Sequence, residues 1–429
     1  MGVINTSEIS VHRVANARKG EPAFILVRRP EMRLHEDATR WLAELAVNSS
    51  FTHQRNIAYA LSHWHTYCLA RGLDYKRATL DDLLTYKLAM ETVVSGTTGE
   101  PLASGTVAQR THAVAGYYAH GVRVAWNLTA LDLQHALRCA QKPNAPTAGE
   151  THALPIDTGA RKLAPRSEPV ETDIRPLDVE PLKQLLSALS PSDAVGLQRD
   201  RIVAEWLCYV GLRIEEVLGN GHSSNYSKTA KEKRGLTVYL IEALTADSEH
   251  PFDHQAVRVV GKYGKARNVA VPNWLILKTQ AYIQGERSRA IRHLKKPTSK
   301  LFVSGESASR MYCGKPLSIR RYQAIFTQAC VRAGLTKLVE KALSSTNQTR
   351  LVHVARHSPH DLRHTYAVMT YFAEAALGNR EPWKPIQAQL GHKRLQTTID
   401  TYLAFVSAHT HWRDLRRVSV RELAGLPNG

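Results

Sequence analysis

The 429-residue chain has 57 lysines and arginines against 38 acidic residues, a formal net charge of 57 − 38 = +19. This excess of positive charge favours a polyanionic partner, since a pocket for a small acidic substrate would not by itself account for it. A generically basic surface would give the same net charge. The five cysteines are odd in number, widely spaced and without a C-x-x-C pair, which is typical of a reducing compartment. No apolar run reaches the length of a membrane span and the N-terminus lacks a signal-peptide pattern, so we expect a cytoplasmic protein without a membrane partner.

The length predicts two or three domains, and the first 140 residues divide into an arm and a helical part. Residues 1–35 are expected to form an N-terminal arm, and the apolar piece 23–27 is either an edge strand or a flexible segment. From residue 36 to residue 140 the apolar residues recur at helical spacing, as at Ile57, Leu61 and Trp64. This pattern predicts a domain of four to five helices.

The remaining sequence predicts a linker followed by a mixed helical and strand-containing domain. Residues 141–170 are rich in proline and lack apolar periodicity, which indicates a linker, and residues 171–429 form the last domain. Helices are expected at 176–189 and 199–210, and strand-like runs at 236–244, 256–261 and 267–271. A polar insertion is expected within 220–255, residues 337–357 are predicted to be irregular, and a final amphipathic helix is predicted after residue 402.

The stretch from residue 358 to residue 402 has the strongest chemical signature. Ser358, Pro359 and Asp361 form a helix start, which puts His360 in the first turn with Arg363 on the same face. An imidazole and a guanidinium at a helix N-terminus favour an anion. A second helix is expected to end at Leu390-Gly391-His392, and a T-x-x-D pattern from Thr397 predicts the start of a helix that carries Tyr402.

Five motifs in order resemble those of a known family. The C-terminal motifs are H-x-L-R-H at 360–364, L-G-H at 390–392 and a T-T-x-D-T-Y that places Tyr402 ten residues after His392 (402 − 392 = 10). Upstream, YVGLRIEEVL at 209–218 and VVGKYGKARNVAVP at 259–272 precede them. Together they resemble the motifs of the tyrosine recombinases, the phage-integrase family of site-specific DNA recombinases.

This resemblance implies a multidomain, mainly α fold with a small antiparallel sheet. An N-terminal helical core-binding domain of the SAM-like type would precede an α+β catalytic domain. Two spacings are longer than is usual for compact members of the family: 262 − 213 = 49 residues from Arg213 to Lys262, and 392 − 363 = 29 from Arg363 to His392. The second includes residues 378–385, and a surface insertion there would leave the site intact whereas a displaced helix would not.

The resemblance also implies a role for each site residue. Tyr402 would be the nucleophile that forms a 3′-phosphotyrosyl link, Arg213 and Arg363 would stabilise charge on the phosphate, and Glu216 would support Arg213. Lys262 would be the general acid, with Lys265 and Arg267 of the same hairpin as competing candidates. His360 and His392 would assist proton transfer or bind the phosphate. Neither a metal nor a cofactor is expected, because Pro359 breaks the helical spacing of His357, His360 and His364 and no acidic or thiol ligand accompanies them.

The expected partners follow from the same resemblance. They are double-stranded DNA and three further copies of the chain, in a homo-tetramer that joins two DNA sites through a Holliday junction. Whether an accessory DNA-bending protein is also a partner is left open. Basic residues that are candidates for phosphate contact are Lys265, Arg267, Arg287, Arg289 and Arg292, although a solvated face is the commoner meaning of such a run. Integration or excision of a mobile element at the bacterial nucleoid is the favoured role. The alternatives are a chromosome-dimer resolvase, a type IB topoisomerase and a catalytically silent DNA-binding protein.

Overall fold

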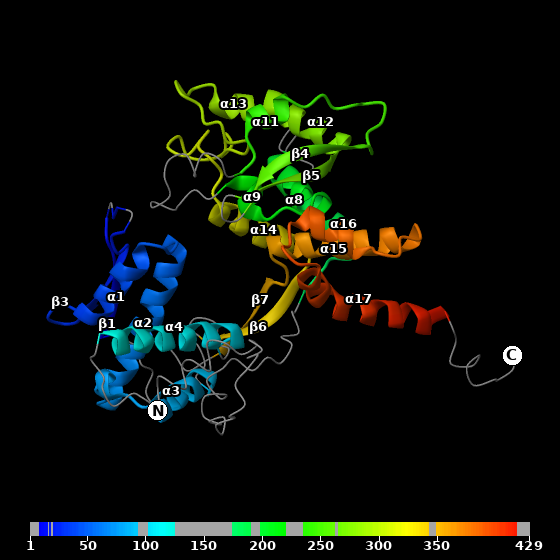
Figure 1. Ribbon diagram of the computed structural model, residues 1–429. Coiled ribbons are helices and arrows are strands. Elements are labelled where there is room, and N and C mark those ends of the chain that lie inside the picture. Colours follow the sequence, from blue (N-terminus) through cyan, green and yellow to red (C-terminus); the bar gives the residue numbers. More distant parts are fainter. Residues whose placement is uncertain are drawn as a thin grey trace, which may run out of the picture. The chain divides into compact units, whose positions relative to one another are not determined.

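The computed structural model describes residues 8–15, 17–18, 20–92, 102–124, 174–189, 198–219, 235–261, 265–342 and 349–417. The chain divides into two units (Figure 1), the first formed mainly by Met1–Glu168 and the second by Pro169–His222, Tyr226–Val339 and Leu351–Gly429. Three expected features lie outside the described residues: the linker 141–170, Lys262, and most of the polar insertion, at 220–234. The side chains of the expected last helix, from residue 408 onward, also lie outside them.

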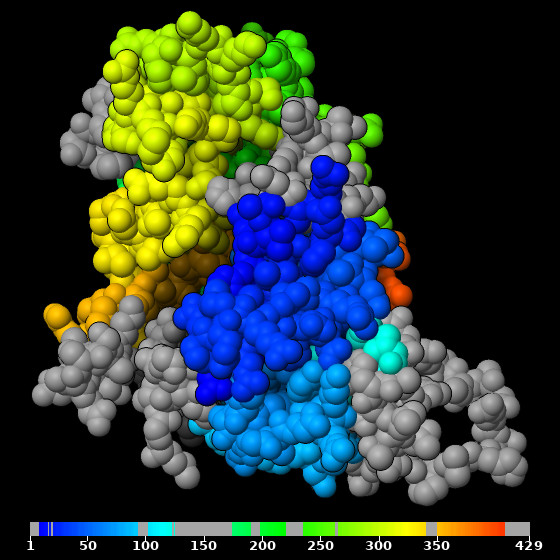
Figure 2. Space-filling view, turned by 90° about the vertical axis from the view of Figure 1, so that its left-hand side faces the viewer, coloured from blue at the N-terminus to red at the C-terminus, as the bar shows by residue number. Residues whose placement is uncertain are grey.

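In its described residues the first unit combines a small sheet with four α-helices. Its antiparallel three-stranded sheet has the order β1-β2-β3 and consists of β1 (Ile9–Arg13), β2 (Phe24–Arg28) and β3 (Arg33–Leu34). The helices are α1 (Glu36–Ala46), α2 (Phe51–Arg71), the 3-10 turn η1 (Tyr75–Arg77), α3 (Leu80–Thr92) and α4 (Ser104–Arg123). The predicted N-terminal strand therefore forms at Phe24–Arg28, but it is the central strand of the sheet and not an edge strand. The sheet shares a core with α1 and α2. Figure 2 shows the surface of the sheet and of α1 and α2 in darker blue, and that of α3 in light blue.

Helix α2 is the centre of the first unit because it is buried on several sides. Ser50 accepts a hydrogen bond at its N-terminus and Gly72 ends it at φ 63°, so both ends are capped. Ser62 Oγ donates to the carbonyl of Ile9 at 2.5 Å, which ties the sheet to this helix. On another face the Trp64 ring is fully buried among aromatic residues.

The described residues of the second unit are mainly helical and include strands of two two-stranded sheets. Its first elements are α7 (Val179–Ala188), α8 (Arg199–Tyr209), α9 (Ile214–Leu218), α11 (Val238–Glu242), β4 (His254–Val260) and β5 (Ala266–Pro272). There follow α12 (Asn273–Tyr282), the π-helical turn η3 (Ile283–Arg287), α13 (Ser288–Ile291), α14 (Ile319–Arg332), β6 (Thr336–Ala342) and β7 (Thr349–Ala355). The last helices are α15 (Pro359–Ala376), α16 (Trp383–Leu390) and α17 (Leu395–Arg417). The prediction of a mainly α fold with small antiparallel sheets is confirmed for the described residues.

Helix α8 and the β4–β5 hairpin form the inner part of this unit. Every residue of α8 from Ile202 to Cys208 is buried, and α15 packs against it. In the hairpin, Val257 pairs with Val269 and both are buried, whereas Arg258 on the adjacent position is exposed. This alternation matches the two-residue period of a half-buried strand, so the strand predictions at 256–261 and 267–271 are confirmed.

Two local predictions are wrong. Residues 236–244 contain the short helix α11 instead of a strand, because Thr237 Oγ1 accepts from the Leu240 backbone NH and caps it, and the buried Val238 and Ile241 are three residues apart. Residues 337–357 are not irregular, since they contain most of β6 and all of β7. The β-branched residues Val352 and Val354 alternate with Leu351 and His353, which fits a strand.

The helix boundaries around the chemical signature follow the sequence closely. Ser358 is the N-cap of α15 with Pro359 in the first turn, and Asp361 Oδ2 accepts from the Ser358 backbone NH at 2.8 Å. Helix α16 ends at Leu390 with Gly391 in the left-handed conformation. Only the T-x-x-D prediction is displaced: α17 begins at Leu395, so Thr397 lies inside its first turn.

A glycine permits the close approach of the segment after α8 to the helices that follow. Gly211 has φ 70°, and a Cβ there would lie 2.5 Å from Tyr366 Cδ1 of α15 and 3.0 Å from Leu390 Cδ2 of α16. Both the backbone conformation and the lack of space therefore require glycine. Two residues later the chain reaches Arg213.

We expect Gly211→Ala to lower the free energy of unfolding by roughly 3 kcal/mol, from left-handed strain plus overpacking. Gly334→Ala is the matched control, because Gly334 has the same φ of 70° but nothing within 4 Å of an added Cβ. It should cost only about 1 kcal/mol. Urea unfolding of the two variants measures the difference, and equal losses would contradict the packing argument.

Candidate active site

Arg213 and Glu216 are placed by the start of helix α9. Arg213 is the N-cap residue, and its backbone NH donates to Glu216 Oε2 at 2.9 Å. The Arg213 Nη1 atom lies 3.4 Å from Glu216 Oε1. A glutamate at the third helical position therefore both caps the helix and holds the arginine that begins it.

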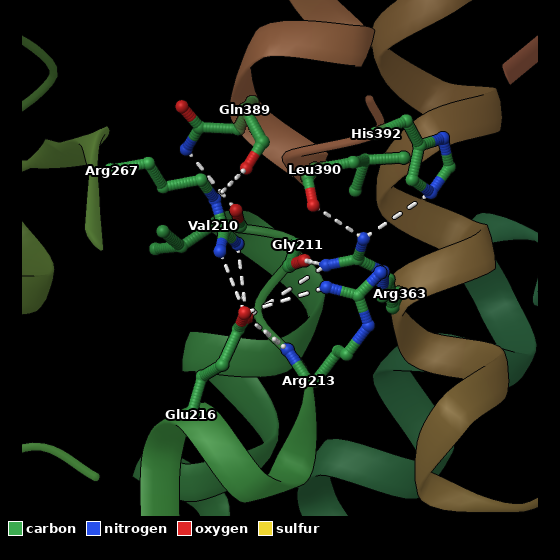
Figure 3. Close-up of polar contacts among 9 residues, drawn as sticks. All are labelled: Val210, Gly211, Arg213, Glu216, Arg267, Arg363, Gln389, Leu390 and His392. Atoms are coloured by element: carbon green, nitrogen blue, oxygen red, sulfur yellow. Dashed lines mark hydrogen bonds and ion pairs between the residues drawn. The ribbon is translucent and has the colours of Figure 1, made fainter. Parts of the chain in front are cut away.

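Arg363 is oriented by two backbone carbonyls from distant parts of the chain. It lies on α15 and is only 2% exposed. Its Nη1 donates to the carbonyl of Gly211 at 2.5 Å and its Nη2 to the carbonyl of Leu390 at 2.7 Å (Figure 3). The guanidinium thus joins the segment after α8 to the end of α16, with one fixed orientation.

One buried carboxylate is surrounded by three guanidiniums. Arg267 of β5 donates to both oxygens of Glu216, at 2.6 and 2.9 Å, while Arg213 lies 3.4 Å and Arg363 3.9 Å away (Figure 3). The group carries a formal charge of 3 − 1 = +2. Burial raises the pKa of Glu216, but the hydrogen bond and charge of Arg267 outweigh it, so that this pKa lies below its ordinary value and the carboxylate is ionised at neutral pH.

His392 lies next to Arg363 at the end of α16. Its Nε2 is 3.5 Å from Arg363 Nη2, and its Nδ1 is 2.9 Å from Thr398 Oγ1 of α17. Burial and then the charges of Arg363 and Arg213 lower the pKa of His392 to about 4, so the imidazole is neutral at neutral pH. The lengthened connection between α15 and α16 therefore does not separate His392 from Arg363.

Tyr402 is buried in the same unit, and a histidine contacts its hydroxyl. The Tyr402 side chain belongs to a small core with Val368, Ile386 and Leu390, and the residue is 1% exposed. Burial raises the pKa of its phenol to about 12, although Arg363 and Arg213 act in the opposite direction. His364 Nδ1 lies 3.1 Å from the Tyr402 hydroxyl oxygen.

Sequence reasoning gave His364 no role at this site, although the sequence contained a signal for it. His364 follows His360 by one helical turn, and residues four apart share a helix face. The two rings meet edge to face, with centroids 4.7 Å apart. His360 is exposed at the surface, and desolvation followed by the charges of Arg363 and Arg213 lowers its pKa. One face of α15 thus presents His360, Arg363 and His364 together.

The remaining candidates from the sequence are placed in different surroundings. Lys265 is exposed on the β4–β5 hairpin, whose described residues omit Lys262. Arg289 and Arg292 are exposed and lie near Glu306, at 3.5 and 3.6 Å. These positions leave the surface arginines accessible to a ligand.

Arg267 and Arg287 were predicted to contact phosphate, but both guanidiniums are bound to other parts of the protein. Arg267 is bound to Glu216, as described above. Arg287 is 4% exposed, and its guanidinium donates to the carbonyls of Thr298, Lys300 and Leu301. A buried arginine whose donors are taken up by backbone carbonyls holds the 298–301 segment in place and is not available to a surface ligand.

The described part of the chain contains no group of three or more His, Cys, Asp or Glu residues that could hold a metal ion. His357, which the sequence grouped with His360 and His364, instead faces Asp361, with Nδ1 3.8 Å from Oδ2.

No described helix is long and apolar enough to cross a membrane.

Comparison with known proteins finds a family model that matches part of the second unit. Residues 241–409 match the model of the phage integrase family. Among solved structures the chain is similar to XerH site-specific recombinase bound to palindromic difH substrate, with 15% identity, a TM-score of 0.48 and coverage of 87% of this chain and 84% of that one. It is also similar to the Tn1549 transposon integrase in complex with transposon right end DNA, with 14% identity, a TM-score of 0.46 and coverage of 89% of this chain and 98% of that one. A lambda integrase dimer bound to a COC' core site is similar with 13% identity, a TM-score of 0.46 and coverage of 85% of this chain and 96% of that one. No curated protein is significantly similar in sequence.

The half-buried His364 and His392 predict that the free energy of unfolding falls in mild acid. Burial and neighbouring positive charges lower the pKa of His364 to about 3 and that of His392 to about 4, whereas an unfolded histidine titrates near 6.5. Between pH 7 and pH 5 the unfolded chain therefore binds more protons than the folded one. The folded protein should lose about 1–2 kcal/mol per histidine over this range.

Urea unfolding of the wild type and of His364→Asn at both pH values measures this effect. The variant should lose about 1–2 kcal/mol less than the wild type on acidification. An identical loss in both proteins would show that His364 is not held neutral by the fold.

Proposed function

We propose that this chain, whose residues 241–409 form a phage integrase family domain, is a site-specific DNA recombinase that cuts and rejoins DNA strands through Tyr402. The observation that carries the proposal is the convergence of Arg213, Arg363, His392 and Tyr402 on one cluster of net charge +2, in the order of the family motifs. A basic chain of net charge +19 suits a DNA partner.

The proposed reaction is an exchange of phosphate esters that needs no ATP. The Tyr402 oxygen attacks the phosphorus of a DNA phosphodiester, an O–P bond to the tyrosine forms, and the bond to the 5′ oxygen breaks. The phenol loses its proton and the leaving 5′ oxygen gains one, for which Lys262 is the proposed donor. The reverse attack by a 5′ hydroxyl restores the phosphodiester and frees the tyrosine.

Each remaining residue has a role that its surroundings support. The Arg213 side chain is 31% exposed, and Arg363 donates one N–H of each Nη atom to a carbonyl, which leaves a second N–H on each. These remaining N–H groups and those of Arg213 are the proposed donors to the oxygens of the reacting phosphate. His392 is neutral and adjacent to Arg363, which suits a hydrogen bond to the same phosphate. His360 is the surface residue of this set and assists proton transfer, while Glu216 supports the arginines.

A buried nucleophile also implies a step before chemistry. The Tyr402 phenol is protonated at neutral pH and is almost fully enclosed, with His364 on its hydroxyl. DNA binding must therefore bring the scissile phosphate into this enclosure or move α17 so that the hydroxyl reaches it. The guanidiniums that bind the phosphate also favour the phenolate, so substrate positioning and nucleophile activation share one cause.

The proposed biological context is integration or excision of a mobile element in the bacterial cytoplasm. Four copies of the chain would act on two double-stranded sites through a Holliday junction, with an accessory DNA-bending protein where the site requires one. Exchange of strands between two sites distinguishes this role from relaxation of a single duplex by a topoisomerase.

Covalent capture tests the proposal. The protein is incubated with fragmented DNA of its source and quenched in SDS, and the protein-bound DNA is sequenced. We expect one short inverted-repeat site to be enriched with the wild type and absent with Tyr402→Phe. Adducts that persist in the variant would place the nucleophile elsewhere, and no adduct with either protein would favour a silent DNA-binding protein.

Arg363→Lys keeps the charge but loses the planar fork that meets two carbonyls and a phosphate. On the captured site its single-turnover cleavage rate should fall about 100-fold. DNA binding in a gel-shift assay should change much less, because other basic residues supply most of it. Arg292→Lys, at an exposed position, is the control that should keep the wild-type cleavage rate. A similar loss of rate in this control would contradict the role of Arg363 at the reacting phosphate.

A further inference from the structure

We infer that Arg267 is a positioning residue that occupies the Glu216 carboxylate and thereby leaves the guanidiniums of Arg213 and Arg363 free to bind the reacting phosphate. This inference rests on the proposed function for its catalytic consequence. Its structural part concerns only three arginines and one carboxylate, and can be tested without DNA.

The distances show that the three arginines do not share Glu216 equally. Arg267 makes two short hydrogen bonds, Nη1 to Oε1 at 2.6 Å and Nη2 to Oε2 at 2.9 Å. Arg213 reaches Oε1 only at 3.4 Å and Arg363 reaches Oε2 at 3.9 Å. The bidentate pairing, which is the strongest geometry available to a carboxylate, is therefore taken by an arginine of the hairpin and not by either phosphate-binding candidate.

Glu216 would not remain unpaired if this partner were lost. Its side chain is 2% exposed, and a buried carboxylate without a partner is strongly disfavoured. The nearest remaining cations are Arg213 and Arg363, each of which needs to move by about 1 Å or less to form a normal hydrogen bond to it. Each donor that turns to Glu216 is then withdrawn from the phosphate.

Arg267 is itself fixed from the other side, so it cannot easily leave Glu216. Its Nε donates to the carbonyl of Gln389 at 3.0 Å. Its Cδ lies against Gly391, where an added Cβ would come within 2.8 Å of it. All three guanidinium nitrogens therefore have protein acceptors (Figure 3), which leaves Arg267 poorly suited to be the proton donor or a DNA contact.

The Gln389 side chain ties the same strand to its neighbours. Its amide exchanges two hydrogen bonds with the backbone of Ala270, at 2.9 and 2.8 Å, and donates to the carbonyl of Val210 at 3.1 Å. Ala270 of β5, three residues after Arg267, is thus held against α16 and against Val210, the residue that follows α8. The position of the guanidinium relative to Glu216 is set by backbone contacts and not by the flexible arginine chain alone.

The test uses a double-mutant cycle with Arg267→Met, which keeps the aliphatic chain but removes the guanidinium, and Glu216→Gln, which keeps an acceptor for the helix cap. On the captured site, Arg267→Met should lower the single-turnover cleavage rate at saturating protein by about 100-fold. The double variant should cleave at least about tenfold faster than Arg267→Met, because a neutral glutamine no longer competes with the phosphate for Arg213 and Arg363. The dissociation constant for DNA should stay within about threefold throughout.

A matched control separates positioning from plain stability. Arg287→Met removes another buried guanidinium in the same unit, and adding Glu216→Gln to it should give no recovery. Arg267→Lys keeps a charge but cannot pair in the bidentate manner, so its rate should fall between those of the wild type and Arg267→Met. A double variant that is as slow as Arg267→Met, or a loss confined to thermal stability with an unchanged rate, would overturn the inference.

Crystal structures of the free variants decide the structural part. In Arg267→Met we expect Glu216 to form short hydrogen bonds to Arg213 or Arg363, and in the double variant we expect both arginines at their present positions. Arginines unmoved in Arg267→Met would refute the inference. If no protein forms covalent DNA while these structures are as expected, the proposed function fails and the positioning of the arginines stands.

Discussion

The buried carboxylate of Glu216 is the interaction on which the rest of the second unit depends. A single negative charge with 2% exposure needs compensation, and three guanidiniums from α9, β5 and α15 supply it. Elements far apart in the chain are thereby brought to one point. Because three positive charges exceed one negative charge, the same arrangement that satisfies the glutamate leaves a cationic site for an anion.

The geometry of that site is set mainly by backbone atoms. Carbonyls of Gly211 and Leu390 orient Arg363, and the carbonyl of Gln389 orients Arg267. Gln389 and Leu390 belong to the last turn of α16, where carbonyls lack partners within the helix, and Gly211 lies in the segment after α8. The segment after α8 and the last turn of α16 therefore orient the arginines through their carbonyls. A site built this way is rigid before a ligand arrives, which favours charge stabilisation without reorganisation.

Local features were well predicted because their causes are local. The N-cap at Ser358, the glycine end of α16 and the alternation of the β4–β5 hairpin depend on residues within a few positions of each other. The error at 236–244 arose because a short apolar run fits both the helical and the strand period, and the error at 337–357 arose because two strands there pair with each other. A threonine cap decided the outcome at 236–244, and pairing of the two strands decided it at 337–357.

The sequence by itself determined the order of the motifs, the helix that carries His360 and Arg363, and the family resemblance. The tertiary structure alone decided what each basic residue does. Arg267 and Arg287 are equally plausible phosphate contacts in sequence, yet one binds a carboxylate 51 residues away and the other binds nearby carbonyls. The role of His364 likewise depends on Tyr402, 38 residues further along the chain. A guanidinium or imidazole can pair with many partners, and only the folded chain selects which ones lie within hydrogen-bonding distance.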